Sequence, residues 1–106
     1  MMIQRIRDWL AGKPHVGRNS GWASLARAFL ALRPGCAVCG TEKGLVPHHI
    51  IPVHVNAAFE MDVSNLIPLC PVHHLWWGHL GNWRSWNVTV RTDAAAWLEK
   101  IRARPK

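Results

Sequence analysis

Cys36-Ala37-Val38-Cys39 and Cys70-Pro71-Val72-His73 are the two segments that decide the fold of this chain. Each holds two possible metal ligands separated by two residues, and structural zinc sites are built from two such pairs in a tetrahedron. Three cysteines, an odd number, fit a disulfide framework poorly. The spacing therefore predicts a structural Zn²⁺ bound by Cys36, Cys39, Cys70 and His73. The alternative is that the cysteines are ordinary buried thiols and His73 is a surface imidazole. His74 could also replace His73 as the fourth ligand.

Length and charge limit the class of protein. At 106 residues the chain makes one small domain, which we divide into an N-terminal helix and basic arm (1–19), a core (20–90) and a C-terminal helix (91–106). The 13 Lys and Arg residues exceed the 6 Asp and Glu residues and give a formal net charge of +7. A polyanionic partner is therefore expected, with nucleic acid favoured over an anionic membrane surface.

The sequence also predicts where the protein resides. No apolar run approaches the roughly 20 residues that span a bilayer, and residues 1–10 lack the apolar core and cleavage site of a signal peptide. We therefore expect a cytoplasmic protein without a membrane partner. Cysteines remain reduced in that compartment and can bind metal.

Hydrophobic spacing predicts helices on both sides of the core. A short amphipathic helix is expected over 3–10 and a connecting arm over 13–20. Ser20 is the expected N-cap of a second helix that runs to about Leu32. Thr92 is the expected N-cap of a last helix over 93–102, whose inward-facing residues should be Ala96, Trp97 and Ile101.

The segment between the two Cys-containing pairs is rich in Val and Ile. Residues 45–53 are expected to form a β-hairpin interrupted at Pro47 and Pro52. Residues 54–64 should be irregular, and a helix should begin at His73 and run to about His79. Together these elements predict an α+β fold.

Three motifs in order resemble a known family. The Cys-x-x-Cys pair is followed by Val46-Pro47-His48-His49-Ile50-Ile51-Pro52, then by Asn65-Leu66-Ile67-Pro68-Leu69-Cys70, then by His73-His74. This order resembles the HNH endonucleases, the ββα-metal nucleases, and in particular a small zinc-stapled branch found among phage and bacterial proteins. The likeness runs from about Arg18 to Val90, although His73 stands where Cys is usual. It implies a small zinc-stapled ββα-metal core with flanking N- and C-terminal helices.

The resemblance also implies roles for individual residues. His49 matches the general base that removes a proton from the attacking water, and imidazole titrates near neutrality without special tuning. His48 should point to the opposite face of the extended segment, and it matches a ligand of the catalytic metal together with His74. Asn65 matches the residue whose amide holds the loop and thereby orients His49. Mg²⁺ or Mn²⁺ is usual for the class, while an all-imidazole pair would also accept Ni²⁺, Co²⁺ or Zn²⁺.

Other residues are candidates for the metal shell or the nucleic-acid surface. His79 could complete the metal shell, but five residues after His74 is poor spacing for one helical face, so surface or phosphate contact is favoured. The expected phosphate contacts are Arg84, Lys13, Arg18 and Arg27, and a solvated basic face is the alternative for each. Core packing is expected for Trp9, Trp22 and Trp97, whereas only one of Trp76 and Trp77 should face inward. His15 and His54 are expected to be ordinary solvated or core histidines.

The leading interpretation is a metal-dependent DNA endonuclease that nicks or cuts both strands and leaves 5′-phosphate and 3′-hydroxyl ends. A non-catalytic, zinc-stabilised nucleic-acid-binding module is the main alternative, and an RNase of the same chemistry is a third. The resemblance to small phage proteins implies a bacterial or phage-infected host cell, with a phage or other protein as a possible partner.

Overall fold

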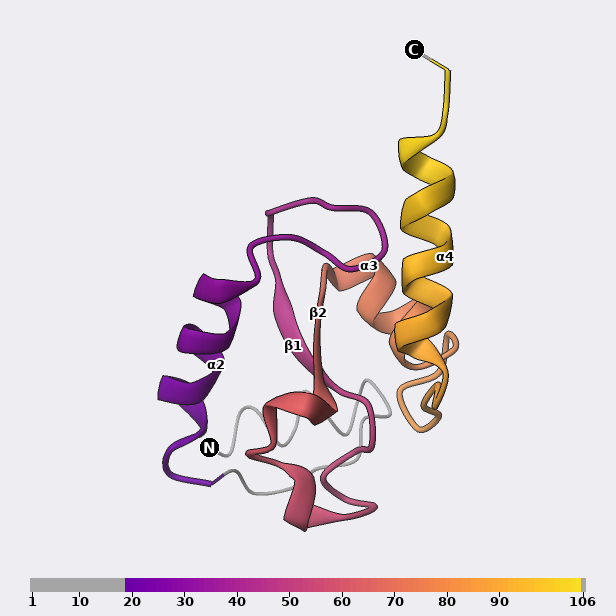
Figure 1. The fold of residues 1–106 in the computed structure, drawn as a ribbon. Coiled ribbons are helices and arrows are strands. Elements are labelled where there is room, and N and C mark those ends of the chain that lie inside the picture. The colour runs from indigo at the N-terminus through magenta and orange to yellow at the C-terminus, as the bar shows by residue number, and fades with distance from the viewer. Residues whose placement is uncertain (1–18, 106) are drawn as a thin grey trace.

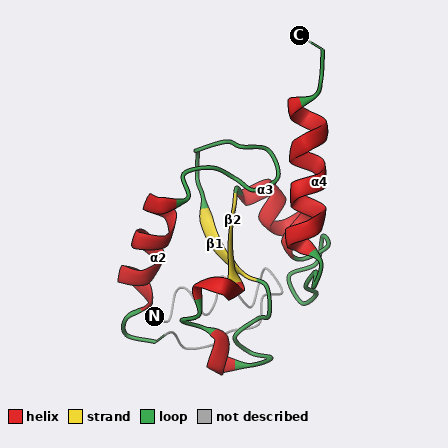
Figure 2. Ribbon diagram, viewed as in Figure 1, coloured by secondary structure: helices red, strands yellow, loops and turns green. Residues whose placement is uncertain are grey.

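The computed structural model describes residues 19–105 and shows two short strands between helices (Figures 1 and 2). Strand β1 (Val46–His49) pairs antiparallel with β2 (Leu66–Leu69). Helix α2 (Trp22–Leu32) lies on one side of the strands, and α3 (Pro71–His73) and α4 (Val90–Arg102) lie on the other. The predicted α+β class is confirmed. Among residues 19–105, no helix is both long enough and apolar enough to cross a membrane.

The predicted hairpin within 45–53 is wrong, because β1 pairs with a distant strand. Pro47 lies opposite Pro68 in the register. Neither proline has an N–H, so this pair must be a non-hydrogen-bonded one, in which backbone groups point away from the partner strand. The Pro68 carbonyl indeed accepts outward, from the Ala37 N–H at 2.9 Å. The prolines that appeared to interrupt one hairpin are therefore compatible with a different pairing.

Helix α2 begins two residues after the predicted N-cap. Its N-cap is Gly21 and carries no side-chain bond, so the assignment to Ser20 is wrong. Asn19 organises the start instead: its Oδ1 accepts from the Gly21 N–H at 2.8 Å and its carbonyl accepts from the Trp22 N–H at 3.0 Å. The predicted end at Leu32 is confirmed, and Phe29 is the fully buried residue on its inner face.

The helix after β2 begins at Pro71 rather than His73, as suits a proline in the first helical turn. It continues from α3 into a π-helical turn, η3 (His74–Gly78). The His79 N–H donates to the His74 carbonyl at 3.1 Å, a bond that spans five residues instead of four. Such single π turns are rare and often lie at functional sites.

The last helix, α4, begins at Val90, so the N-cap is Thr89 and the predicted cap at Thr92 is wrong. The inward face is also shifted: Val90 and Ala94 are buried, whereas Ala96 and Trp97 are exposed. Ile101 is partly buried. The start of the helix is fixed by tertiary contacts, because the Arg91 guanidinium donates to the carbonyls of Ser64 and Leu66 at 2.9 and 3.3 Å.

The core lies between β2, the start of α4 and the two Cys-containing segments. Its buried members are Cys36, Val38, Ile67, Leu69, Cys70, Val90 and Ala94. Trp77 packs against it while Trp76 is 57% exposed, so the prediction that one of the two indoles faces inward is confirmed. The excursion between the strands contains two 3-10 turns, η1 (Ala57–Phe59) and η2 (Val63–Asn65). The predicted helix at 3–10 and most of the arm at 13–20, with Trp9 and His15, lie outside the described residues.

Candidate active site and structural metal centre

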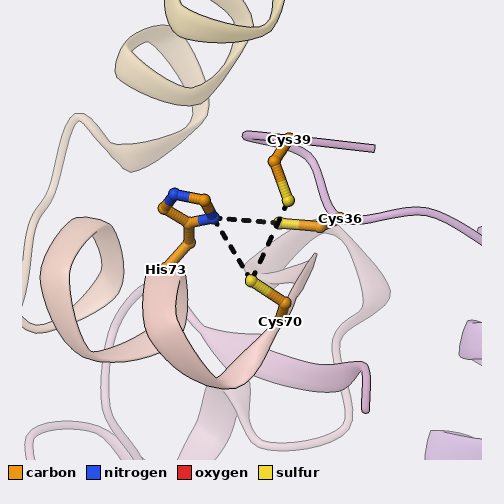
Figure 3. Close-up of side chains that lie close together, drawn as sticks. All are labelled: Cys36, Cys39, Cys70 and His73. Atoms are coloured by element: carbon orange, nitrogen blue, oxygen red, sulfur yellow. Dashed lines mark hydrogen bonds between the residues drawn. The ribbon is translucent and has the colours of Figure 1, made fainter. Parts of the chain in front are cut away.

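Four side chains from the two Cys-containing segments converge beside the core (Figure 3). The Nδ1 atom of His73 lies 3.2 Å from the sulfur of Cys70 and 3.8 Å from that of Cys36, and the sulfurs of Cys39 and Cys70 are 4.0 Å apart. A tetrahedron with Zn–S bonds near 2.3 Å has edges of roughly 3.8 Å. These distances suit four ligands of one ion better than four weak thiol hydrogen bonds. The group can therefore hold a structural metal such as zinc.

The pKa values of the thiols in this group are shifted from their ordinary value. Burial and then the neighbouring thiols of Cys36 and Cys70 together raise the pKa of Cys39 to about 11. Burial also works against ionisation of Cys36, but backbone hydrogen bonds, first from Cys70, outweigh it and lower its pKa. A divalent cation would supply the charge that three adjacent thiolates need. His73, not His74, is the histidine of this group.

A second group of possible metal ligands consists of His48, His74 and His79, whose nearest nitrogen atoms lie within 4.8 Å of one another. The ring centroids are 4.8 to 5.0 Å apart and every pair of rings meets edge to face. We call these residues the three-imidazole cluster. Three imidazole nitrogens this close together are a possible donor set for a divalent transition metal.

His48 is the most enclosed member of the cluster, at 1% exposure. The pKa of its ring is lowered to about 2, mainly by burial and further by repulsion from the nearby rings of His74 and His79. Its Nε2 atom is buried and has no hydrogen-bond partner within residues 19–105. A buried polar atom without a partner is costly, and a metal ion is the kind of partner that would satisfy it.

His79 joins the cluster because of the π turn. On the assumption of an α-helix, the sequence favours surface or phosphate contact for His79. That spacing argument is wrong, because η3 is a π-helical turn with hydrogen bonds between residues five apart. His79 Nδ1 lies 2.7 Å from the Ser85 carbonyl and donates to it. The neutral ring then carries its lone pair on Nε2. A backbone carbonyl that fixes the tautomer in this way is typical of metal-binding histidines.

His49 lies on the other face of β1, as predicted for adjacent residues in a strand. Its Nε2 is 3.0 Å from the Glu60 carbonyl, which can only accept, so Nε2 carries the proton and Nδ1 carries the lone pair. The ring stacks on the Trp22 indole with centroids 4.6 Å apart and planes at 30°. The two faces of one strand thus present two chemically distinct histidines.

Asn65 connects the excursion to the end of β1, at 8% exposure. Its Oδ1 accepts from the Ile51 N–H at 2.9 Å, and its Nδ2 donates to the carbonyls of Ile51 and Phe59 at 3.0 and 3.3 Å. Phe59 precedes Glu60, whose carbonyl contacts His49. The amide therefore holds the peptide unit that precedes the one whose carbonyl contacts His49, in keeping with the loop-holding role that the resemblance implies for Asn65.

Residues 36–80 match the family model described as HNH endonuclease. Residues 36–80 therefore belong to the HNH family. The predicted family and the zinc-stapled core are thereby confirmed. No curated protein and no solved structure matches the chain significantly. The matched segment of the HNH domain includes both metal-binding groups as well as His49 and Asn65.

Several aromatic and basic residues of the chain lie outside the matched segment. Trp83 packs against the rings of His74 and His79, with centroids 5.1 and 5.0 Å apart. The neighbouring Arg84 is exposed, as is Arg27 on α2. Lys13 and Arg18 lie outside the described residues. His54 is exposed and touches Trp86 edge to face at 5.9 Å, in keeping with an ordinary solvated histidine.

Sequence reasoning missed three residues that shape the HNH site. Gly78 lies against the His48 ring, since a Cβ at this position would be 2.9 Å from His48 Cε1. Asn87, at 7% exposure, links the π turn to α4. Glu60 is buried and contacts Asn19 and His49. Only Asn87 had a sequence signal, because Asn two residues before Thr at a helix start is typical of a capping turn.

Proposed function

We propose that this chain is a metal-dependent DNA endonuclease that hydrolyses phosphodiester bonds. The HNH family suggests nuclease activity. The observation that carries the proposal is the pairing of His49, with Nδ1 as its lone-pair nitrogen, with the three-imidazole cluster that begins at the adjacent residue. Hydrolysis needs a base for water and positive charge for phosphate, and β1 presents one of these on each face.

His49 acts as the general base in this proposal. Its Nδ1 takes a proton from the attacking water, and the oxygen of that water bonds to phosphorus while the bond to the 3′ oxygen breaks. The departing 3′ oxygen takes a proton from solvent, so the products are a 5′-phosphate and a 3′-hydroxyl. As the ring becomes an imidazolium, the Glu60 carbonyl continues to accept from Nε2 and stabilises the positive charge.

His48, His74 and His79 would hold the catalytic cation. A divalent cation held there would supply charge to the phosphate and to the departing 3′ oxygen. Mg²⁺ and Mn²⁺ are the ions expected from the family, whereas a set of nitrogen donors without a carboxylate favours Ni²⁺, Co²⁺ or Zn²⁺ over Mg²⁺. We therefore expect activity with Ni²⁺ or Mn²⁺ to exceed activity with Mg²⁺.

DNA is the proposed substrate because the chain has a formal net charge of +7. Arg84 lies one residue from Trp83, which touches two members of the three-imidazole cluster. In this proposal the exposed Arg84 contacts a phosphate next to the scissile one. Arg27 is exposed on α2, the helix that carries Trp22, and would contact phosphate on the His49 side.

The test is a time course of supercoiled plasmid with Mg²⁺, Mn²⁺ and Ni²⁺ added separately. We expect nicked plasmid from the wild type and a loss of about 100-fold or more in His49→Ala, the scale of a general base. His54→Ala is the matched control and should keep wild-type activity, since His54 is exposed.

Intact plasmid with all three ions, together with DNA binding in a mobility-shift assay, would contradict the proposal and favour a non-catalytic binding module. Faster cleavage of structured RNA than of plasmid would instead assign the same chemistry to an RNase.

A further inference from the structure

We infer that Trp22 is a positioning residue for His49, and that Glu60 anchors it there. The inference rests on the proposed role of His49 as the general base. Trp22 lies outside the segment that matches the HNH family, and its indole is expected on sequence grounds to pack into a core. The structure gives it a more specific contact.

The contact between Trp22 and His49 is a ring stack. The centroids are 4.6 Å apart and the planes are inclined by 30°. His49 is 8% exposed, so its ring has little solvent around it. A planar neighbour at this distance restricts the tilt of the imidazole, because rotation out of the stack would bring its edge against the indole face.

A second contact restricts the remaining freedom of the His49 ring. Nε2 of His49 donates a hydrogen bond to the Glu60 carbonyl at 3.0 Å, so the Nε2 edge of the ring points toward that carbonyl. The stack fixes the plane and the hydrogen bond fixes the rotation within that plane. Both are needed to aim the Nδ1 lone pair in one direction.

Trp22 is itself tied to the residue that makes the second contact. The Trp22 N–H donates to the Asn19 carbonyl at 3.0 Å, and the Asn19 N–H donates to the Glu60 carboxylate at 3.0 Å. Glu60 therefore contacts His49 through its carbonyl and the start of α2 through its side chain. These contacts form a closed cycle. They connect α2, β1 and the segment between the two strands, and His49 is one of the residues in the cycle.

A purely structural role for Trp22 makes a different prediction from a positioning role. Loss of packing would lower stability and activity together, whereas loss of position lowers kcat while KM and metal affinity stay unchanged. Misplacement of a reacting group by about 1 Å can cost about 100-fold in rate. We expect Trp22→Leu to lower kcat by about 10- to 100-fold. Trp22→Phe keeps a planar face and should remain within about 3-fold of the wild type.

The experiment measures kcat and KM for plasmid nicking together with the Ni²⁺ dissociation constant. Trp97→Leu is the matched control, because Trp97 lies on α4 and contacts Trp77 rather than His49. It should leave kcat unchanged. Glu60→Ala removes the acceptor for the Asn19 N–H and should lower kcat in the same direction as Trp22→Leu.

A readout that does not need activity is the tautomer of His49, observed in long-range ¹H–¹⁵N spectra. Wild type and Trp22→Phe should show only the Nε2–H tautomer, and Trp22→Leu should show a mixture. If the wild type fails to nick any plasmid, the proposed function fails, and the tautomer result alone decides whether Trp22 orients His49.

The inference would be overturned by wild-type kcat in Trp22→Leu, by an equal loss in Trp22→Phe and Trp22→Leu, or by a single unchanged tautomer in Trp22→Leu. A change in KM without a change in kcat would also overturn it, because it would place Trp22 in contact with DNA.

Discussion

The ring of His48 is enclosed by backbone as well as by other imidazoles. A Cβ at Gly78 would lie 2.9 to 3.1 Å from three atoms of the ring, and the ring is 1% exposed, so it has no space to retreat. Glycine at 78 is therefore required by the close approach of β1 to the π turn. This requirement is invisible in the sequence, because the two residues are 30 positions apart along the chain.

Gly78→Ala should displace the His48 ring and weaken Ni²⁺ binding by about 10- to 100-fold, the effect expected from disturbing the support of a metal ligand. The crowding should also lower the free energy of unfolding by about 1–3 kcal/mol. Calorimetric titration with Ni²⁺ and urea denaturation measure the two effects. Val90→Ala, a core change remote from the cluster, should destabilise the protein but leave Ni²⁺ affinity unchanged. Equal affinities in all three proteins would contradict the proposed ligand set.

The pKa of His48 predicts acid sensitivity of the protein when no metal occupies the three-imidazole cluster. Burial holds this pKa at about 2 in the folded state, against 6.5 for an ordinary histidine. The unfolded chain therefore takes up a proton below pH 6.5 while the folded chain does not. Stability should fall as the pH decreases from 6.5 toward 2, by at most about 1.4 kcal/mol per pH unit.

Urea denaturation at pH 7, 6 and 5 measures this dependence. His48→Gln removes the titrating group and leaves the Cys-containing site unchanged, so its curve accounts for any acid release of the structural metal. Parallel pH profiles for the wild type and His48→Gln would contradict the assignment.

At the scale of elements, the π turn η3 is the feature that completes the site. Asn87 supports it: its N–H donates to the Gly78 carbonyl at 2.9 Å and its Nδ2 donates to the Trp77 carbonyl at 3.0 Å. The same side chain bonds Thr89 and Asp93 at the start of α4. One buried amide thus fixes both the end of η3 and the beginning of α4.

Asn87→Ala should lower the free energy of unfolding by about 2–4 kcal/mol, because it leaves buried backbone groups without partners. It should also weaken Ni²⁺ binding, since His79 follows the turn that Asn87 holds. Urea denaturation and Ni²⁺ titration test both effects. Asn82→Ala is the control: Asn82 is exposed and caps only the Arg84 N–H, so its loss should change stability little. If Asn87→Ala changed neither the free energy of unfolding nor the Ni²⁺ affinity, η3 would form without the support of Asn87.

At the scale of the whole molecule, the Cys₃His group and the hydrophobic core are one unit. Cys36 and Cys70 belong to the buried cluster with Ile67, Leu69 and Val90. A chain of 106 residues gains only a small margin of stability from burial alone. A metal bound by the Cys₃His group would therefore contribute directly to folding.

Removal of the metal by a strong chelator should abolish cooperative thermal unfolding, and Cys36→Ser should do so without chelator. Circular dichroism during heating measures both effects. Restored unfolding cooperativity on addition of Zn²⁺ in slight excess is the control for chelation. An unchanged cooperative transition in either case would remove the structural role of the Cys₃His group.

The sequence predicted which residues come together at the two candidate metal sites more accurately than it predicted the secondary-structure elements. Cys36, Cys39, Cys70 and His73 were found by spacing, because short-range pairs place their ligands together in almost any tight turn. His48 and His49 were separated correctly by strand alternation. The hairpin and the two N-caps were wrong, because each depends on a partner distant in the sequence, such as Leu66 for β1.

The sequence by itself determined which residue types could bind metal, the family and the opposite directions of His48 and His49, since these follow from local spacing and alternation. Only the tertiary structure decided that His79 joins His48 and His74, that Trp22 stacks on His49 and that Gly78 and Asn87 support the site. The physical reason is that a π turn and a non-local strand pairing are stabilised by buried contacts between distant segments. No local pattern of residues encodes those contacts.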